Sequence, residues 1–153
     1  MRLPKDWREF IELMNSSGVE YVVVGGHAVG YHGYPRYTGD LDFFVRPSRE
    51  NARLLVKVLV DFGFDGADEL EDTLSEPDKV VQLGRPPNRI DLLTGISGVD
   101  FDEASRDCVT ASMEGTPVKI IGRDALLKNK RGSGRTKDLA DAEEIEKTPP
   151  PEA

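Results

Sequence analysis

The chain has 153 residues, which fits one domain of ordinary size and leaves no room for a second full core. Apolar residues make up 38% of the sequence and there are 15 glycines, a composition typical of globular proteins and not of disordered or collagen-like ones. We therefore expect a single domain over residues 1–147, followed by a disordered tail over 148–153 that begins Thr-Pro-Pro-Pro.

Composition and charge also exclude several classes of protein. No apolar run approaches the roughly 20 residues of a membrane span, and the first residues lack the apolar stretch of a signal peptide, so we expect a cytoplasmic protein with no membrane partner. The single cysteine and two histidines cannot build a Cys/His zinc site, so any metal must be held by oxygen. A net charge of −8 argues against a protein that coats a nucleic-acid backbone.

The N-terminal segment is predicted to be an amphipathic helix that ends near residues 15–18. Asp6 is the expected N-cap. Four apolar side chains recur at the spacing of one buried helical stripe: Trp7, Phe10, Ile11 and Met14.

Two buried strands are expected next. Residues 20–24 are a β-branched and aromatic run that stops at Gly25-Gly26, and a brief helix is expected over 27–32. Residues 40–45 show the second strand pattern.

Ser48 is expected to cap a helix that runs to residues 62–63. The predicted apolar face of this helix is Ala52, Leu55, Val56, Leu59 and Val60.

The second half of the chain is predicted to hold three strands and three helices. The stretch 65–78 has seven acids and no cation, and we expect it to be a solvated loop or an exposed helix. Strands are expected at 80–83 and 90–93, joined as a hairpin, and at 118–121. Helices are expected at about 102–106, 124–130 and 137–146, the last two split by Gly132-Ser133-Gly134.

Asp40 and Asp42 are the most informative residues of the sequence. Residues two apart on a strand point to the same face, so the two carboxylates stand side by side while Leu41 and Phe43 face the core. Two such charges repel, and burial raises the pKa of one of them unless a cation neutralises it. Mg²⁺ suits the position because it prefers hard oxygen ligands. By itself, an Asp-x-Asp pair is more often an exposed strand end than a metal site.

Asp91 strengthens the metal interpretation. It is a lone acid in the apolar run Ile90-Asp91-Leu92, and a buried aspartate is costly unless it is paired or metal-bound. If its strand neighbours that of Asp40 and Asp42 with matched facing, three carboxylates converge at one end of the sheet.

Upstream, Gly25-Gly26 would let a phosphate approach the backbone closely, although a Gly-Gly turn alone is nonspecific.

The cations are concentrated near the C-terminus. Residues 119–137 contain seven Lys or Arg and a single acid, Asp124. This segment is either a solvated helical surface or a small phosphate-facing patch.

The order strand, Gly-Gly, thirteen residues, Asp-x-Asp and a later Asp resembles the nucleotidyltransferase superfamily that includes DNA polymerase β, antibiotic nucleotidyltransferases and nucleotidyltransferase-type toxins and antitoxins. The matching residues are Val24-Gly25-Gly26, Asp40-Leu41-Asp42-Phe43 and Ile90-Asp91-Leu92. Three further segments resemble small bacterial nucleotidyltransferase-like proteins related to abortive-infection toxins: Gly25-Gly26-His27-Ala28, Arg36-x-Thr38-x-Asp40 and Gly134-Arg135-x-Lys137-Asp138. The resemblance covers about residues 18–141.

The resemblance implies an α+β protein with a minimal nucleotidyltransferase fold, in which helices flank a mixed β-sheet and a short helical segment ends the chain. It implies a catalytic and metal site at Asp40, Asp42 and Asp91 that binds Mg²⁺, with Mn²⁺ as the alternative ion. The nucleotide-binding residues it implies are Gly25, Gly26, Arg36, Thr38, Lys128, Arg135 and Lys137, and Lys130 is a further basic candidate.

The resemblance also implies a reaction. The enzyme would transfer a nucleoside monophosphate from a nucleoside triphosphate to a hydroxyl acceptor on RNA, a protein or a small molecule. The alternative is a nucleotide-binding module of the same fold that acts as a protein partner or antitoxin subunit, because the chain lacks the long helical domain that selects the acceptor in larger members. Haloacid-dehalogenase-like phosphatases share only the Asp-x-Asp pair, and nucleotide-sugar glycosyltransferases usually need a larger domain.

Overall fold

A mixed sheet forms the centre of the molecule. The computed structural model describes residues 5–35, 38–85 and 87–149, and within these ranges the sheet has six strands in the order β3-β4-β2-β1-β6-β5. β2 runs parallel to β4 and β1 parallel to β6, and the other neighbours are antiparallel. The strands are β1 (Tyr21–Val24), β2 (Asp40–Val45), β3 (Val80–Leu83), β4 (Arg89–Leu93), β5 (Val109–Met113) and β6 (Thr116–Ile120).

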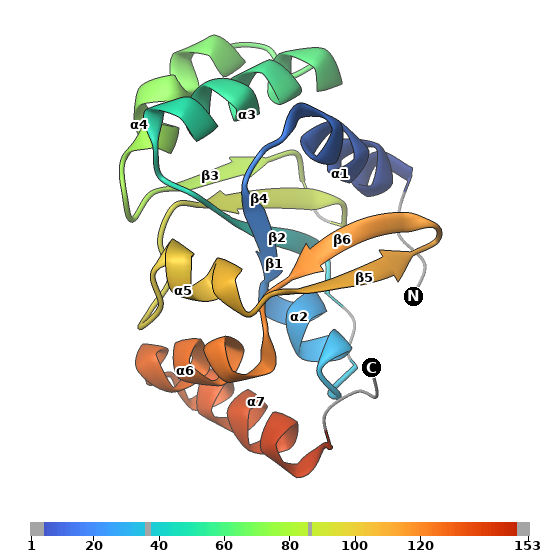
Figure 1. Ribbon diagram of the computed structural model, residues 1–153, viewed down its shortest axis with the longest axis vertical. Helices are drawn as coiled ribbons and strands as arrows, with labels where there is room; N and C mark the ends of the chain where they lie inside the picture. The colour runs from blue at the N-terminus through green and yellow to red at the C-terminus, as the bar shows by residue number, and fades with distance from the viewer. Residues whose placement is uncertain (1–4, 36–37, 86, 150–153) are drawn as a thin grey trace.

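Helices cover both faces of this sheet (Figure 1). They are α1 (Lys5–Ser17), α2 (Gly25–Tyr31), α3 (Arg49–Phe62), the 3₁₀ helix η1 (Ala67–Leu70), α4 (Glu71–Ser75), α5 (Phe101–Arg106), α6 (Arg123–Ser133) and α7 (Thr136–Lys147). α1, α3 and α4 lie on one side of the sheet, and α5, α6 and α7 lie on the other. This arrangement confirms the expected α+β class.

Alternate residues of β2 build the core on the two faces. The ring of Phe43 packs against Phe10 of α1 with a centroid distance of 5.6 Å, while the next ring, Phe44, packs against Phe101 of α5 at 5.3 Å. The four predicted stripe residues of α1 are all buried. The expected N-cap is wrong, because α1 already includes Lys5 and so Asp6 lies in its first turn.

The capping of α3 is confirmed, but one residue of its predicted face is wrong. The Ser48 hydroxyl accepts a hydrogen bond from the backbone N–H of Asn51. Val60 is 54% exposed, whereas Val58 is buried. Successive helical residues are about 100° apart, so the burial of Leu59 turns Val60 toward solvent.

The second half of the chain differs from expectation at two places. The β3–β4 hairpin is confirmed, but β5 was not predicted, because this edge strand is only half-buried and contains Thr and Ser. The expected helix break at 132–134 occurs only at Gly134, and Gly132 and Ser133 belong to α6. Gly132 lies against Gly98, where a Cβ atom would come within 3.3 Å of the Gly98 Cα, so the missing side chain lets α6 dock on the loop that follows β4.

The acid-rich stretch forms exposed short helices, as expected. The guanidinium of Arg49 pairs with Glu71 and Asp72 at 3.1 and 2.6 Å.

None of the described helices is long and apolar enough to span a bilayer. Of the predicted tail, residues 150–153 lie outside the described residues, while the Thr148 hydroxyl donates to the backbone carbonyl of Glu144.

Asn51 joins the start of β1, the end of β2 and α3. Its side-chain oxygen accepts from the N–H of Glu20 at 2.8 Å, and its amide nitrogen donates to the carbonyls of Glu20 and Arg46 at 3.0 and 3.1 Å. Asn51 is 3% exposed, so water does not readily replace these bonds.

We expect Asn51→Ala to lower the free energy of unfolding by about 2–4 kcal/mol, because it leaves part-buried backbone groups without partners. Urea denaturation measures this loss. The matched control is Lys57→Ala on the exposed side of the same helix, which should stay within about 0.5 kcal/mol of wild type. Equal losses in the two variants would refute the assignment.

Candidate active site

Three aspartates meet on one face of the sheet. Asp40 and Asp42 are two residues apart on β2, and the parallel register places Asp42 directly opposite Asp91 of β4. One carboxylate oxygen from each of the three lies within 4.8 Å of the others. The expected convergence of Asp40, Asp42 and Asp91 is confirmed.

The end of β1 approaches this cluster through a glycine. The antiparallel register places Val24 opposite Asp42, and Gly25 follows with a φ of +71°. A Cβ atom at Gly25 would lie 2.2 Å from Oδ2 of Asp42, so both the backbone conformation and the available space require glycine. Gly26 packs similarly against Thr38, whose side chain would lie 3.1 Å from a Cβ at residue 26.

Gly25, Gly26 and Thr38 line a small hollow together with Asp40 and Asp42. The Thr38 hydroxyl lies 3.0 Å from Oδ1 of Asp40, to which it donates a hydrogen bond. With Lys137, six of the predicted site residues therefore surround one space, and the further basic candidate Lys130 lines it too.

Arg89 is a site residue that the sequence analysis missed. It lies opposite Asp40 in the parallel register, and its guanidinium pairs with Asp40 and Asp91, each at 2.9 Å. The available signal was its position two residues before Asp91, which places both side chains on the same face of a strand. Arg89 thus compensates two of the three carboxylates.

Of the three carboxylates, Asp42 has the least of its negative charge compensated by a nearby cation, because Arg89 pairs with the other two. Burial, followed by the negative charges of Asp40 and Asp91, raises its pKa to about 7. Its Oδ1 is buried and has no hydrogen-bond partner within the described ranges. A buried carboxylate oxygen without a donor, beside two further carboxylates, fits the hard oxygen ligand set of Mg²⁺ or Mn²⁺.

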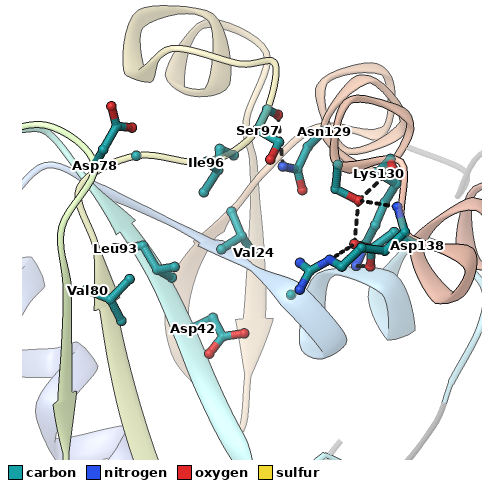
Figure 2. Close-up of a pocket in the computed structure, with 14 residues that line it drawn as sticks. Val24, Asp42, Asp78, Val80, Leu93, Ile96, Ser97, Asn129, Lys130 and Asp138 are labelled. Atoms are coloured by element: carbon teal, nitrogen blue, oxygen red, sulfur yellow. Dashed lines mark hydrogen bonds and ion pairs between the residues drawn. The ribbon is translucent and has the colours of Figure 1, made fainter.

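Basic residues of α6 and of the short connection between α6 and α7 face the cluster across the hollow. Lys130 is buried, and its ammonium pairs with Asp138 at 3.1 Å and Asp141 at 3.4 Å. Arg135 pairs with the other oxygen of Asp138 at 3.1 Å. Figure 2 shows Lys130 and Asp138 on the side of the hollow opposite Val80 and Leu93. Although burial opposes it, hydrogen bonds from Ser133 and Lys130 hold the pKa of Asp138 below its ordinary value.

The predicted basic contacts divide into three groups. Lys137 lines the small hollow beside Asp40 and Asp42, and Arg135 lines a larger hollow that also reaches Asp42. Lys128 is not among the described residues that line either hollow, because its ammonium pairs with Glu103 of α5 at 2.8 Å. Arg36 lies outside the described residues.

The raised pKa of Asp42 makes stability depend on pH. Between about pH 4 and pH 7, the Asp42 carboxyl is protonated in the folded state but ionised in the unfolded chain, where an aspartate has its ordinary pKa near 4. The free energy of unfolding therefore falls as pH rises from about 4 to about 7 and is level above pH 7. We expect Asp42→Asn to remove this fall, stabilising the metal-free protein by about 4 kcal/mol at about pH 8.5 and by only about 1 kcal/mol at about pH 5.

Urea denaturation at the two pH values, with a chelator present, measures this difference. Asp61→Asn, which changes an exposed aspartate of α3, is the matched control and should show no such pH dependence. A stability difference for Asp42→Asn that is the same at both pH values would contradict the assignment.

Comparison with solved structures identifies the fold. The lincosamide antibiotic adenylyltransferase LnuA, solved with lincomycin bound, is 15% identical, with a TM-score of 0.55 over 95% of this chain and 97% of its own. The antibiotic-resistance factor ANT(2'')-Ia is 13% identical, with a TM-score of 0.56 over 92% of this chain and 80% of its own. An antigenic nucleotidyltransferase-like protein from Paracoccidioides brasiliensis is 17% identical, with a TM-score of 0.52 over 95% of this chain and 76% of its own. These likenesses establish the nucleotidyltransferase fold.

Sequence comparison identifies the family. No curated protein matches the chain. The sequence profile of a family described as "nucleotidyl transferase of unknown function" matches residues 4–150. Since this match spans nearly the whole chain, the protein belongs to that family of nucleotidyltransferases.

Proposed function

We propose that this nucleotidyltransferase uses Mg²⁺, with Mn²⁺ as the alternative ion, to transfer a nucleoside monophosphate from a nucleoside triphosphate to a hydroxyl group of a small molecule. The observation that carries the proposal is the cluster of Asp40, Asp42 and Asp91, whose oxygens lie within 4.8 Å of one another. Oxygen ligands this close repel one another unless a cation lies among them.

The metal would be held by Asp40, Asp42 and Asp91. Its positive charge would compensate the phosphate oxygens and the three carboxylates together. Arg89 would keep Asp91 oriented, because its guanidinium contacts both Asp91 and Asp40.

The triphosphate would lie in the hollow between the cluster and α7. The backbone at Gly25 and Gly26 carries no side chain there, so phosphate oxygens could approach its N–H groups closely. Lys137 would attract the phosphate charge from the opposite wall, and Arg135 would add positive charge from the adjoining larger hollow. Thr38 would keep Asp40 in place through its hydroxyl.

The chemistry would be an in-line substitution at the α-phosphorus. The acceptor oxygen forms a bond to this phosphorus while the bond to the bridging oxygen of pyrophosphate breaks, and pyrophosphate leaves. The acceptor proton passes to a carboxylate oxygen of Asp91 and from there to solvent. Catalysis rests on positioning and charge compensation, which a preformed cluster provides.

The solved structures support a small-molecule acceptor over RNA or a protein. One is a lincosamide adenylyltransferase with lincomycin bound, and another is ANT(2'')-Ia in complex with adenylyl-2''-tobramycin. Transfer to an acceptor of similar size would need no additional acceptor-binding domain.

Incubation with nucleoside triphosphates labelled at either the α- or the γ-phosphate tests the reaction. We expect α-label to appear on a small molecule of a metabolite extract, γ-label to leave as pyrophosphate, and Asp42→Asn to abolish both. Transfer of γ-label would indicate a kinase and contradict the proposal. Binding of triphosphate without transfer of either label would favour the alternative, a nucleotide-binding module acting with a protein partner.

Asp42→Asn should also lower the affinity for a nonhydrolysable triphosphate in Mg²⁺ at least about tenfold, because a metal ligand is lost. Calorimetric titration in Mg²⁺ and in a chelator measures the effect. Asp61→Asn is again the control. Equal affinities of Asp42→Asn and wild type would rule out Asp42 as a metal ligand.

A pair of lysine variants tests the triphosphate position. We expect Lys137→Ala to weaken triphosphate binding about three- to tenfold at low salt and less at high salt, because an exposed charge contact is screened. Lys128→Ala should leave the affinity unchanged, since the Lys128 ammonium is held by Glu103 on another surface. The reverse ranking would place the triphosphate elsewhere.

A further inference from the structure

A larger hollow opens on the other side of Asp42. It measures about 420 Å³ and reaches the cluster through Gly25 and Asp42. The triphosphate would occupy the small hollow beside Gly26 and Thr38, so this second space remains open next to the reacting centre. Its volume suits a molecule of small-ligand size.

One wall of this larger hollow is apolar. Val80 and Leu93 face each other in the antiparallel register of β3 and β4, and Ile96 follows on the loop after β4. Figure 2 shows these three side chains on the side opposite Lys130 and Asp138. Val80 is 56% exposed although β3 is an edge strand, where charged residues usually protect the sheet. A ligand with an apolar face would cover this strip.

The outer rim of the hollow carries an uncompensated negative charge. Asp78 has a φ of +60°, in the left-handed region that costs a non-glycine residue about 1 kcal/mol. Its carboxylate lies over Gly95, where a Cβ atom would come within 2.1 Å of Oδ1. No described residue forms an ion pair or hydrogen bond with the Asp78 side chain, whereas the cations of the opposite wall, Lys130 and Arg135, are both paired with Asp138.

From this distribution we infer that the larger hollow binds the acceptor, and that the acceptor is a small amphiphilic alcohol with a cationic group rather than a nucleic acid. The inference rests on the proposed function. The hydroxyl lies at the Asp42 end, the apolar part covers Val80, Leu93 and Ile96, and the cation pairs with Asp78 at the rim. The hydroxyl oxygen forms the bond to the α-phosphorus, pyrophosphate leaves, and the hydroxyl proton goes to Asp91. A polyanion would meet the charge of Asp78 as it entered.

Three six-carbon alcohols that differ only in their far end test the inference: 6-aminohexanol, hexane-1,6-diol and 6-hydroxyhexanoate. Each is titrated into the full chain with Mg²⁺ and the α,β-methylene analogues of ATP, GTP, CTP and UTP in turn. The methyl NMR signals of Val80 and Ile96 report on the apolar wall. We expect the amino alcohol to bind about fivefold more tightly than the diol and the carboxylate to bind most weakly.

Asp78→Asn should abolish the preference for the amino alcohol and leave triphosphate binding unchanged, because asparagine tolerates the left-handed conformation and lacks the charge. Glu76→Gln, which changes an exposed acid two residues away, is the matched control and should keep the preference.

The outcomes separate this inference from the proposed function. If a triphosphate analogue binds but the three alcohols leave the Val80 and Ile96 signals unchanged, or if octaadenylate shifts these signals more than the amino alcohol does, the inference is wrong and the proposed function stands. If no triphosphate analogue binds in Mg²⁺, both are wrong.

Discussion

Repulsion among three carboxylates is the constraint on which the rest of the site depends. Asp40, Asp42 and Asp91 share one face of adjacent parallel strands, with one oxygen of each within 4.8 Å of the others. Burial removes the water that would otherwise screen them, and the pKa of Asp42 rises to about 7 as a consequence. The folded protein tolerates this arrangement because hydrophobic packing on both faces of β2 fixes the two strands in register.

The nearby cations are arranged so that one carboxylate stays available. Arg89 pairs with Asp40 and Asp91, and Lys130 is held across the hollow by Asp138 and Asp141. Asp42 therefore has a buried oxygen without a hydrogen-bond donor among the described residues, and a divalent ion would supply the missing charge. The same crowding explains Gly25, since no side chain fits beside the Asp42 carboxylate.

The residue spacing of a strand was enough to predict the acidic cluster. It did not lead us to Arg89, to the choice between Lys128 and Lys130, or to β5. The two-residue period of a strand was enough to place Asp40 beside Asp42, and the same rule applied to β4 would have found Arg89. The sequence could not show whether Lys128 or Lys130 faces the site. Residues two positions apart on a helix point to nearly opposite sides, and the docking of α6 decides which of the two faces the site. β5 was missed since its half-buried edge position needs little apolar sequence.

The most direct test of the account is the titration of the Asp42 side-chain carboxyl, followed by its ¹³C NMR signal with and without Mg²⁺. We predict a pKa near 7 in the metal-free protein. With Mg²⁺ the carboxyl should stay ionised to well below that pH, because the ion favours the charged form. An ordinary aspartate pKa near 4 without metal, unchanged when Mg²⁺ is added, would contradict the claim that these carboxylates form a divalent-metal site.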